Sequence, residues 1–186
     1  MNDLLDRTLL DCDRLKNLSR LCASLDDRSV PGCIIEVGVY RGGSAKHLAR
    51  INPDRAVLLF DTFEGIPHES WDLDWHKRGD FTADFEDVKT YLSDCPNIKI
   101  YQGVFPATLP KEIVRVALAH VDVDMEQSAR ESIVALWPII APGGYLIFDD
   151  YAAEACRGVK RAVDEMFSSR VAIGPHPQAW IYKEKI

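Results

Sequence analysis

Aspartates gather at two places in the sequence where a buried strand is predicted to end. Asp122 ends the apolar run VALAHVD and Asp124 lies two residues beyond it, while Asp149 and Asp150 end the run YLIFDD. Unpaired carboxylates gathered at strand ends repel one another and resist ionising together, unless a cation such as Mg²⁺ compensates their charge. The four side chains therefore predict a site for a hard divalent metal.

A glycine-bearing turn follows the first predicted strand, in EVGVYRGGSA at residues 36–45. The backbone amides of such a turn and the N-terminus of the helix after it can receive an anionic ligand group. Gly38, Gly42 and Gly43 do not match the GxGxxG spacing of dinucleotide-binding proteins, which disfavours a nicotinamide-dependent oxidoreductase. Asp61 ends the second predicted strand, where an acid can accept hydrogen bonds from both ribose hydroxyls of a nucleoside cofactor. An adenosine-type ligand is therefore predicted.

Short apolar runs alternate with helical patterns along most of the chain. The runs predicted as buried parallel strands are residues 33–38, 56–61, 98–103, 116–122 and 145–150. The predicted helices are residues 44–50, 85–92, 127–140 and 155–167. Two closing strands are predicted at residues 171–173 and 179–183, as a hairpin with an antiparallel member. The fold class is thus α/β: a Rossmann-like, doubly wound, mostly parallel seven-stranded sheet with an antiparallel C-terminal strand.

Two segments outside this alternation have their own interpretations. Apolar residues from Leu4 to Leu21 recur at three- and four-residue steps, which predicts an amphipathic helix within residues 1–28. Its apolar stripe either covers the sheet of its own chain or pairs two chains in a homodimer. Residues 62–81 show little periodicity, and a loop of that length is often a functional lid. Its aromatic and histidine side chains either contact an acceptor or pack the loop down: His68, Trp71, Trp75 and His76.

Composition limits the class of protein. A chain of 186 residues has room for one α/β domain, which we expect to span residues 1–186. The formal charge of −7 and the lack of a Lys/Arg run argue against a nucleic-acid partner. Five scattered cysteines without CxxC spacing predict reduced thiols, with neither a zinc site nor a disulfide framework. The acidic start of the sequence and the lack of a long apolar stretch predict a cytoplasmic protein without a membrane span.

Several ordered motifs together resemble an S-adenosylmethionine-dependent O-methyltransferase, with glutamate and glycine ending strand one, an acid ending strand two and metal carboxylates after strands four and five. The turn EVGVYRGGSA is similar to that of catechol O-methyltransferase. The closer resemblance is to the macrocin O-methyltransferase family, from about residue 34 onward. The motifs that carry it are DTFEGIP, KRGDF, GVFPATLP, HVDVD, FDDY and CRGVKRAVDE.

The resemblance implies a role for individual residues. It implies that Glu36, Gly38 and Gly42 shape the turn that binds S-adenosylmethionine. Tyr40 and Ser44 would lie near the methionine carboxylate of the cofactor, and Asp61 would bind its ribose. It assigns Mg²⁺ or another divalent cation to Asp122, Asp149 and Asp150. His120, which precedes the metal aspartate by two positions, is interpreted as an interior histidine and not as a ligand.

Methyl transfer also requires an acceptor hydroxyl that loses its proton. A hydroxyl on Mg²⁺ is more acidic, and a vicinal diol can occupy two coordination positions, so we expect a sugar, glycoside or related diol as the small-molecule acceptor. Asp124 lies two residues beyond Asp122 and can share its side of the chain, which makes it the candidate general base. Binding the metal directly, or holding one of its ligands in place, is an equal alternative for Asp124.

One stretch departs from the family pattern. After Asp124 the family usually shows Leu, Tyr, Glu, Ser and Thr, whereas this chain has Met125, Glu126, Gln127, Ser128 and Ala129. The departure keeps one rival open, a non-catalytic module of the same fold that binds metal or nucleoside. The other rival is an NAD-dependent oxidoreductase, and it is disfavoured because this chain lacks the GxGxxG glycine pattern of dinucleotide-binding proteins.

Overall fold

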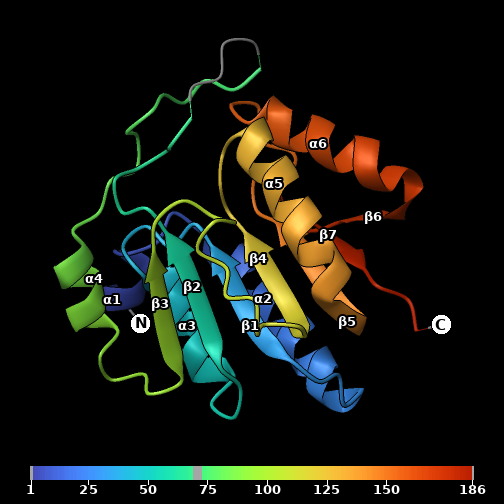
Figure 1. The fold of residues 1–186 in the computed structure, drawn as a ribbon, viewed down its shortest axis with the longest axis horizontal. Helices are drawn as coiled ribbons and strands as arrows, with labels where there is room; N and C mark the ends of the chain where they lie inside the picture. The colour runs from blue at the N-terminus through green and yellow to red at the C-terminus, as the bar shows by residue number, and fades with distance from the viewer. Residues whose placement is uncertain (1, 69–72, 186) are drawn as a thin grey trace.

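A seven-stranded sheet forms the centre of the protein (Figure 1). The computed structural model describes residues 2–68 and 73–185. The strands run in the order β3-β2-β1-β4-β5-β7-β6. Their bounds are β1 Cys33–Val37, β2 Val57–Asp61, β3 Ile98–Gln102, β4 Val116–Val121, β5 Ile140–Phe148, β6 Val171–Ile173 and β7 Ala179–Tyr182. The first five are parallel, β7 is antiparallel to β5, and β6 is antiparallel to β7. The predicted fold class is confirmed.

Strand order changes direction in the middle of the sheet, and this change places the site. From β1 the chain adds β2 and β3 on one side, then crosses over to add β4 and β5 on the other. In open α/β sheets, ligands bind at the carboxyl ends of the strands beside such a switch point. Every residue of β4 is buried, as the apolar run predicts for a central strand covered on both faces.

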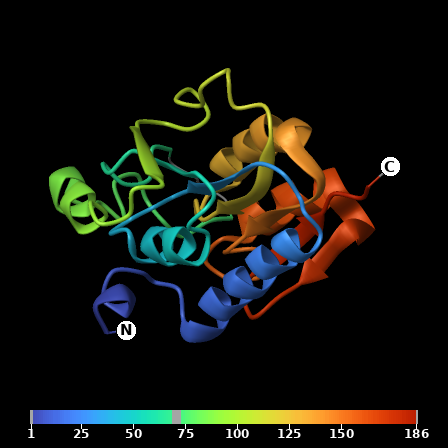
Figure 2. The same ribbon diagram turned by 90° about the horizontal axis from the view of Figure 1, so that it is seen from below.

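Helices cover both faces of the sheet (Figure 2). One face packs against α2 and α3, whose leucines join a core with Ile34, Leu59 and Ile147. The other face packs against α5 and α6, in a second core with Phe60 and Phe148. The helix bounds are α1 Asn2–Leu5, α2 Cys12–Asp27, α3 Gly43–Ile51, α4 Phe85–Tyr91, α5 Glu126–Leu136 and α6 Arg157–Phe167. These packed layers fix the ends of the strands and so hold the site in place.

The N-terminal helix is not continuous, which corrects the prediction of a single helix within residues 1–28. The chain forms α1, leaves helical structure over residues 6–11, and begins α2 at Cys12. The break has a local cause, because the Asp11 carboxylate caps α2 by accepting hydrogen bonds from the backbone N–H groups of Asp13 and Arg14, both at 2.9 Å. The non-helical segment crosses the start of α3, where the N–H of Gly43 donates to the carbonyl of Arg7 at 2.9 Å.

The apolar stripe of α2 is used within the chain. Its leucines, including Leu18, Leu21 and Leu25, are buried in the first core against the sheet. The stripe therefore offers no surface for a partner, and a homodimer stays a prediction without this support. Within the described ranges, 2–68 and 73–185, the helices are all too short or too polar to cross a bilayer.

Candidate active site

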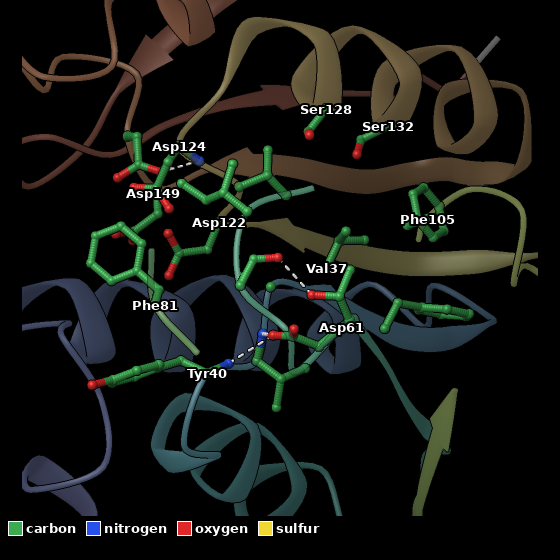
Figure 3. A pocket seen from close by; sticks show the side chains of 18 of the residues that line it. Val37, Tyr40, Asp61, Phe81, Phe105, Asp122, Asp124, Ser128, Ser132 and Asp149 are labelled. Carbon is green, nitrogen blue, oxygen red and sulfur yellow. Dashed lines mark hydrogen bonds between the residues drawn. The ribbon is translucent and has the colours of Figure 1, made fainter. Parts of the chain in front are cut away.

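A pocket opens at the carboxyl ends of β1, β2, β4 and β5 (Figure 3). Two separate predictions meet there, because the cofactor turn and Asp61 line one side while the aspartates after β4 and β5 line the other. Of the ten predicted site residues, eight line the pocket: Gly38, Tyr40, Ser44, Asp61, Asp122, Asp124, Asp149 and Asp150. Glu36 and Gly42 do not belong to the lining.

Asp61 holds the cofactor turn in shape. Its Oδ2 accepts hydrogen bonds from the backbone N–H groups of Val39 at 2.6 Å and Tyr40 at 2.9 Å, and its Oδ1 accepts one from Phe63 at 2.7 Å. Tyr40 has a left-handed backbone with φ of 50°, a conformation that costs energy for a tyrosine and that these bonds help to fix. A carboxylate offers about four acceptor positions, so Asp61 keeps one for a ligand hydroxyl.

The two glycines of the turn have different structural roles. Gly38 has φ of +86°, and a Cβ there would stand 1.7 Å from the carbonyl oxygen of Asp122, so only glycine lets the ends of β1 and β4 approach this closely. Gly42 is the left-handed N-cap of α3, and a Cβ there would face the side chains of Val88 and Leu92, away from the pocket. Gly42 thus shapes the turn from outside the pocket lining, and its contact with the cofactor stays a prediction.

Glu36 does not belong to the pocket lining, and a direct contact between this residue and the cofactor stays a prediction. It is fully buried, and its Oε1 lies 3.0 Å from Nδ1 of His120. The other ring nitrogen of His120, Nε2, lies 3.4 Å from Oδ1 of Asp149. His120 is thus the interior histidine that the sequence predicts, and it also links the end of the cofactor strand β1 to the end of β5.

Charge determines the protonation of this link. Burial alone would lower the pKa of His120, but the hydrogen bonds and charges of Asp149 and Glu36 raise it to about 9. Burial would likewise raise the pKa of Asp149, but its hydrogen bond with His120 and the charges of His120 and Arg14 lower it. Asp149 is therefore an ionised carboxylate beside an imidazolium.

Asp122, Asp149 and Asp150 form a carboxylate cluster. Each offers one oxygen, and these oxygens all lie within 4.8 Å of one another. Burial and the charges of Asp149 and Asp150 hold the pKa of Asp122 well above its usual range. Burial and the charge of Asp149 raise the pKa of Asp150 to about 6. Three hard oxygen donors that repel one another in a buried place fit a divalent cation such as Mg²⁺.

Arg14 joins the cluster from α2, and sequence reasoning missed it. Its guanidinium forms an ion pair with Oδ2 of Asp149, whose Oδ1 also accepts a hydrogen bond from the amide nitrogen of Gln178 at 2.7 Å. Asp149 therefore has donors on both oxygens, whereas no ion pair to Asp122 or Asp150 is found among the described residues, although the charge of Arg14 also lowers the pKa of Asp150. The helical spacing that predicts α2 gives no sign that one of its polar residues turns back toward the sheet.

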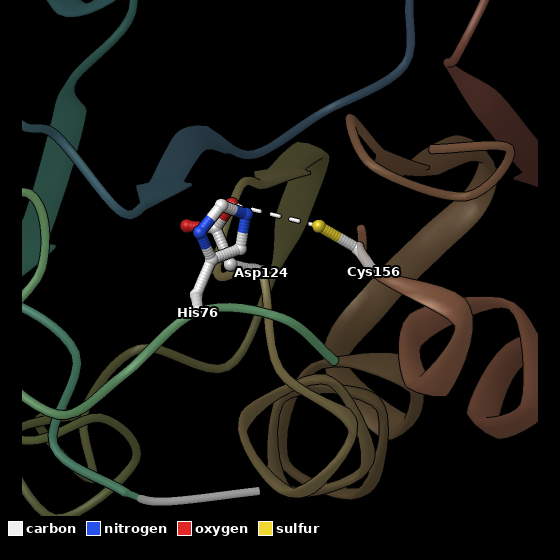
Figure 4. Close-up of side chains that lie close together, drawn as sticks. All are labelled: His76, Asp124 and Cys156. Carbon is white, nitrogen blue, oxygen red and sulfur yellow. Dashed lines mark hydrogen bonds and ion pairs between the residues drawn. The ribbon is translucent and has the colours of Figure 1, made fainter. Parts of the chain in front are cut away.

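Asp124 faces the same pocket from a bent backbone. Its φ is 59°, a left-handed value, and its carboxylate is not one of the three whose oxygens all lie within 4.8 Å of one another. Its Oδ1 lies 3.6 Å from Nε2 of His76 and accepts a weak hydrogen bond from the Sγ of Cys156 at 3.7 Å (Figure 4). Burial and the charge of Asp150 hold the pKa of Asp124 well above its usual range. A left-handed residue does not continue an extended strand, so the simple alternation of strand side chains does not hold at Asp124.

The predicted lid is attached to the helices beside the pocket through Asp74, which sequence reasoning also missed. Its buried carboxylate accepts hydrogen bonds from the backbone N–H groups of Glu126 at 3.0 Å and Gly158 at 2.7 Å, in the first turns of α5 and α6. The N-cap residues Met125 and Cys156 make no side-chain cap of their own. One carboxylate therefore caps two helices, where the helix dipoles favour negative charge.

The lid side chains divide between the pocket and the surface. Phe81 lines the pocket and makes edge-to-face contacts with the rings of Tyr40 and His76, at centroid distances of 6.4 and 4.9 Å. Trp75 is exposed, and Trp71 lies outside the described residues. An acceptor role for these aromatic side chains stays a prediction, and of the predicted histidines only His76 approaches a pocket carboxylate at 3.6 Å.

Two serines of α5 also face the pocket. Ser128 and Ser132 are buried and line it, and the hydroxyl of Ser132 has no hydrogen-bond partner in the described protein. A buried hydroxyl without a partner is costly unless a ligand or water satisfies it. Their spacing of one helical turn could have indicated a polar stripe on an otherwise apolar helix face.

The family described as Macrocin-O-methyltransferase (TylF) matches residues 4–174. The 8-demethyl-8-(2,3-dimethoxy-alpha-L-rhamnosyl)-tetracenomycin-C 4'-O-methyltransferase of Streptomyces olivaceus is 32% identical over 170 residues, covering 81% of this chain. The demethyldecarbamoylnovobiocin O-methyltransferase of Streptomyces niveus is 30% identical over 176 residues, covering 85% of this chain. The chain spans 64% and 66% of the length of these two relatives.

Solved structures show the same fold. The O-methyltransferase NovP superposes with a TM-score of 0.84 at 26% identity, over 96% of this chain and 83% of that chain. The calicheamicin methyltransferase CalS11 superposes with a TM-score of 0.81 at 20% identity, over 97% of this chain and 83% of that chain. The two Streptomyces relatives and NovP are named as O-methyltransferases, which favours the methyltransferase interpretation over the oxidoreductase.

The double cap by Asp74 predicts how firmly the lid is held. Asp74→Asn keeps the size of the side chain but removes its charge and one acceptor, so the free energy of lid opening should fall by about 1–3 kcal/mol. Trypsin cleavage after the exposed Lys77 and Arg78 should then accelerate roughly 5- to 150-fold. Glu64→Gln, which neutralises an exposed acid of the same loop, serves as the control. Equal cleavage rates in both variants would contradict a lid held by Asp74.

Proposed function

The chain belongs to the macrocin O-methyltransferase family, and from this we propose that it transfers a methyl group from S-adenosylmethionine to a hydroxyl of a sugar, glycoside or related diol, with a divalent cation. One observation carries the proposal: a turn suited to a nucleoside cofactor and a cluster of metal-type carboxylates open onto a single pocket. Methyl donor and metal-bound acceptor would therefore meet in one cavity, as in-line transfer requires.

Residues of β1 and β2 would bind the cofactor. The remaining acceptor position of Asp61 suits a ribose hydroxyl, and the backbone of the turn at Gly38 leaves room for close approach. Ser44, in the first turn of α3, and Tyr40 lie where a methionine carboxylate could use the positive end of that helix. Glu36 would act from below by fixing the strand end through His120.

The three-carboxylate cluster would hold the cation. Its oxygen donors lie close enough together to bind one ion, and their burial makes an uncompensated charge costly. When bound, Mg²⁺ would supply charge compensation and would make a bound hydroxyl more acidic. His120 and Arg14 keep Asp149 ionised and oriented, so that at least one ligand is ready.

Asp124 would take the proton of the acceptor hydroxyl. It lines the pocket but stands outside the three-carboxylate cluster, so its Oδ atoms stay free of the ion that the cluster suits. Its left-handed backbone, fixed in part by the hydrogen bond from its N–H to Oδ2 of Asp150 at 3.3 Å, aims the carboxylate at the lid side of the pocket. An acceptor that enters beneath the lid would meet it there.

The acceptor class follows from the relatives and from the pocket. The S. olivaceus relative is named for methylation of a rhamnosyl compound. In this chain, the apolar pocket residues Ile66, Pro67 and Phe81 belong to the lid, and Phe105 lies on the facing loop. Apolar and aromatic faces pack against sugar rings, while a diol would meet the polar carboxylate edge. This arrangement supports a glycoside or sugar acceptor.

Calorimetric titration tests the cofactor and metal together. S-adenosylhomocysteine titrated into the metal-free protein should bind, whereas NAD should give no heat of binding. Mg²⁺ should bind to the native protein, and Asp150→Asn should weaken Mg²⁺ binding by at least about 10-fold because one charged ligand is lost. Absence of S-adenosylhomocysteine binding would contradict the proposal. Binding without turnover on a broad panel of diols and glycosides would instead support a non-catalytic module.

Removal of the proposed base gives a second test. Asp124→Asn should lower kcat by roughly 10²- to 10⁴-fold, the usual contribution of general acid–base catalysis, while S-adenosylhomocysteine affinity stays within about 2-fold. Asp54→Asn, at an exposed aspartate, is the matched control and should leave kcat unchanged. If Asp124→Asn turns over like the native enzyme with the same pH profile, Asp124 is not the base.

A further inference from the structure

A second group of metal-ligating side chains stands beside the three-carboxylate cluster. We propose that His76, Asp124 and Cys156 form a binding site for Zn²⁺ or a similar borderline-soft divalent cation, distinct from the three-carboxylate cluster. One nitrogen, one oxygen and one sulfur of these residues lie within 4.8 Å of one another. Figure 4 shows the imidazole and the thiol both directed toward the Asp124 carboxylate.

The distances suit a tetrahedral ion. Nε2 of His76 lies 3.6 Å and Sγ of Cys156 lies 3.7 Å from Oδ1 of Asp124. Ligand atoms on one tetrahedral Zn²⁺ stand roughly 3.4–3.6 Å apart, because Zn–N and Zn–O bonds are about 2.0–2.2 Å and Zn–S bonds about 2.3 Å. The third pair, His76 and Cys156, is known to lie within 4.8 Å, so a shift of up to about 1.2 Å between these two ligand atoms would complete three ligand positions. A fourth position would be left for water, as in zinc sites with three protein ligands.

The donor set selects the kind of ion. Thiolate and imidazole ligands favour Zn²⁺ and related ions, whereas Mg²⁺ prefers oxygen alone. The neighbouring cluster of Asp122, Asp149 and Asp150 offers only oxygen. The two sites would thus select different metals by their ligand chemistry. They are neighbours, because the N–H of Asp124 donates to Oδ2 of Asp150. A metal-bound thiol is deprotonated, so zinc binding would release the Cys156 proton to solvent.

The surrounding backbone places the three ligands independently of any ion. Asp74 pairs with Cys156 in an isolated antiparallel bridge, and the N–H of Trp75 donates to the carbonyl of Ala155 at 2.8 Å. These contacts set His76, the next residue of the lid, opposite Cys156 at the start of α6. Asp124 comes from the end of β4 and lines the pocket, which offers an ion a route in. Such prior placement lowers the cost of assembling the site.

An ion at this site would join the lid to the body of the protein. It would add a bond between His76 and two residues of the pocket wall, and so hold residues 73–80 closed. If Asp124 is the base, a consequence that rests on the proposed function, zinc would also inhibit methyl transfer by occupying it. Binding of the ion itself does not depend on that function.

Metal titration of the full chain tests the proposal without substrate or cofactor. With excess Mg²⁺ present to occupy the three-carboxylate cluster, Zn²⁺ should bind with one equivalent per chain in competition with a chromogenic chelator. Co²⁺ in place of Zn²⁺ should give the near-ultraviolet charge-transfer absorption of a thiolate ligand. Cys156→Ser should abolish that absorption, and His76→Gln should weaken Zn²⁺ binding by at least about 10- to 100-fold.

Matched variants separate this site from other binding. Cys12→Ser, at an exposed thiol, and His68→Gln, at another lid histidine, should leave Zn²⁺ affinity unchanged. His76 is only half-buried, so His76→Gln remains informative if the buried Cys156→Ser unfolds. The proposal is overturned if His76→Gln binds Zn²⁺ like the native chain, or if Asp150→Asn alone removes Zn²⁺ binding. Zinc binding with no S-adenosylhomocysteine binding would refute the proposed function and leave this site standing.

Discussion

Buried negative charge at the carboxyl ends of β4 and β5 is the constraint on which the rest of the site depends. Desolvation disfavours an ionised carboxylate, so each buried acid needs a proton, a cation or a set of donors. The protein supplies Arg14, His120 and Gln178 to Asp149, and this linkage ties α2, β4 and the C-terminal strands to one carboxylate. Among the described residues no cation forms an ion pair with Asp122 or Asp150, and burial and neighbouring carboxylates raise their pKa values, which leaves a deficit of positive charge. A bound divalent ion would remove it.

Much of this arrangement follows from the sequence, because it depends on local pattern. Apolar runs predict where the strands end more closely than where they begin, because β5 starts at Ile140 and not at Tyr145. Parallel order brings the carboxyl ends of the strands to one edge, so the grouping of Asp122 with Asp149 could be inferred from strand ends alone. The backbone conformation at two places could not be inferred from the sequence. The left-handed bend at Asp124 breaks the alternation of strand side chains, and the Asp11 cap divides a pattern that otherwise reads as one helix.

Contacts between segments far apart in the sequence explain why the sequence did not reveal the other residues of the site. Arg14 and Asp74 are polar residues in segments whose periodicity or irregularity says nothing of their partners, yet one compensates Asp149 and the other caps α5 and α6. The zinc-type ligands likewise come from the lid, β4 and the start of α6, so no spacing motif could indicate them. Short-range patterns specify the elements, whereas packing between elements decides which polar groups meet. The lid is therefore held by the same edge that forms the pocket, which couples its position to the proposed chemistry.

Anomalous diffraction would test the central claim most directly, that the carboxylate edge is a divalent-metal site. Crystals grown with S-adenosylhomocysteine and soaked in Mn²⁺, which accepts the same oxygen ligands as Mg²⁺, would locate the ion independently of activity. The account predicts one strong manganese peak bound by oxygens of Asp122, Asp149 and Asp150, next to the cofactor product. Clear density for the product with no manganese peak among these aspartates would contradict it.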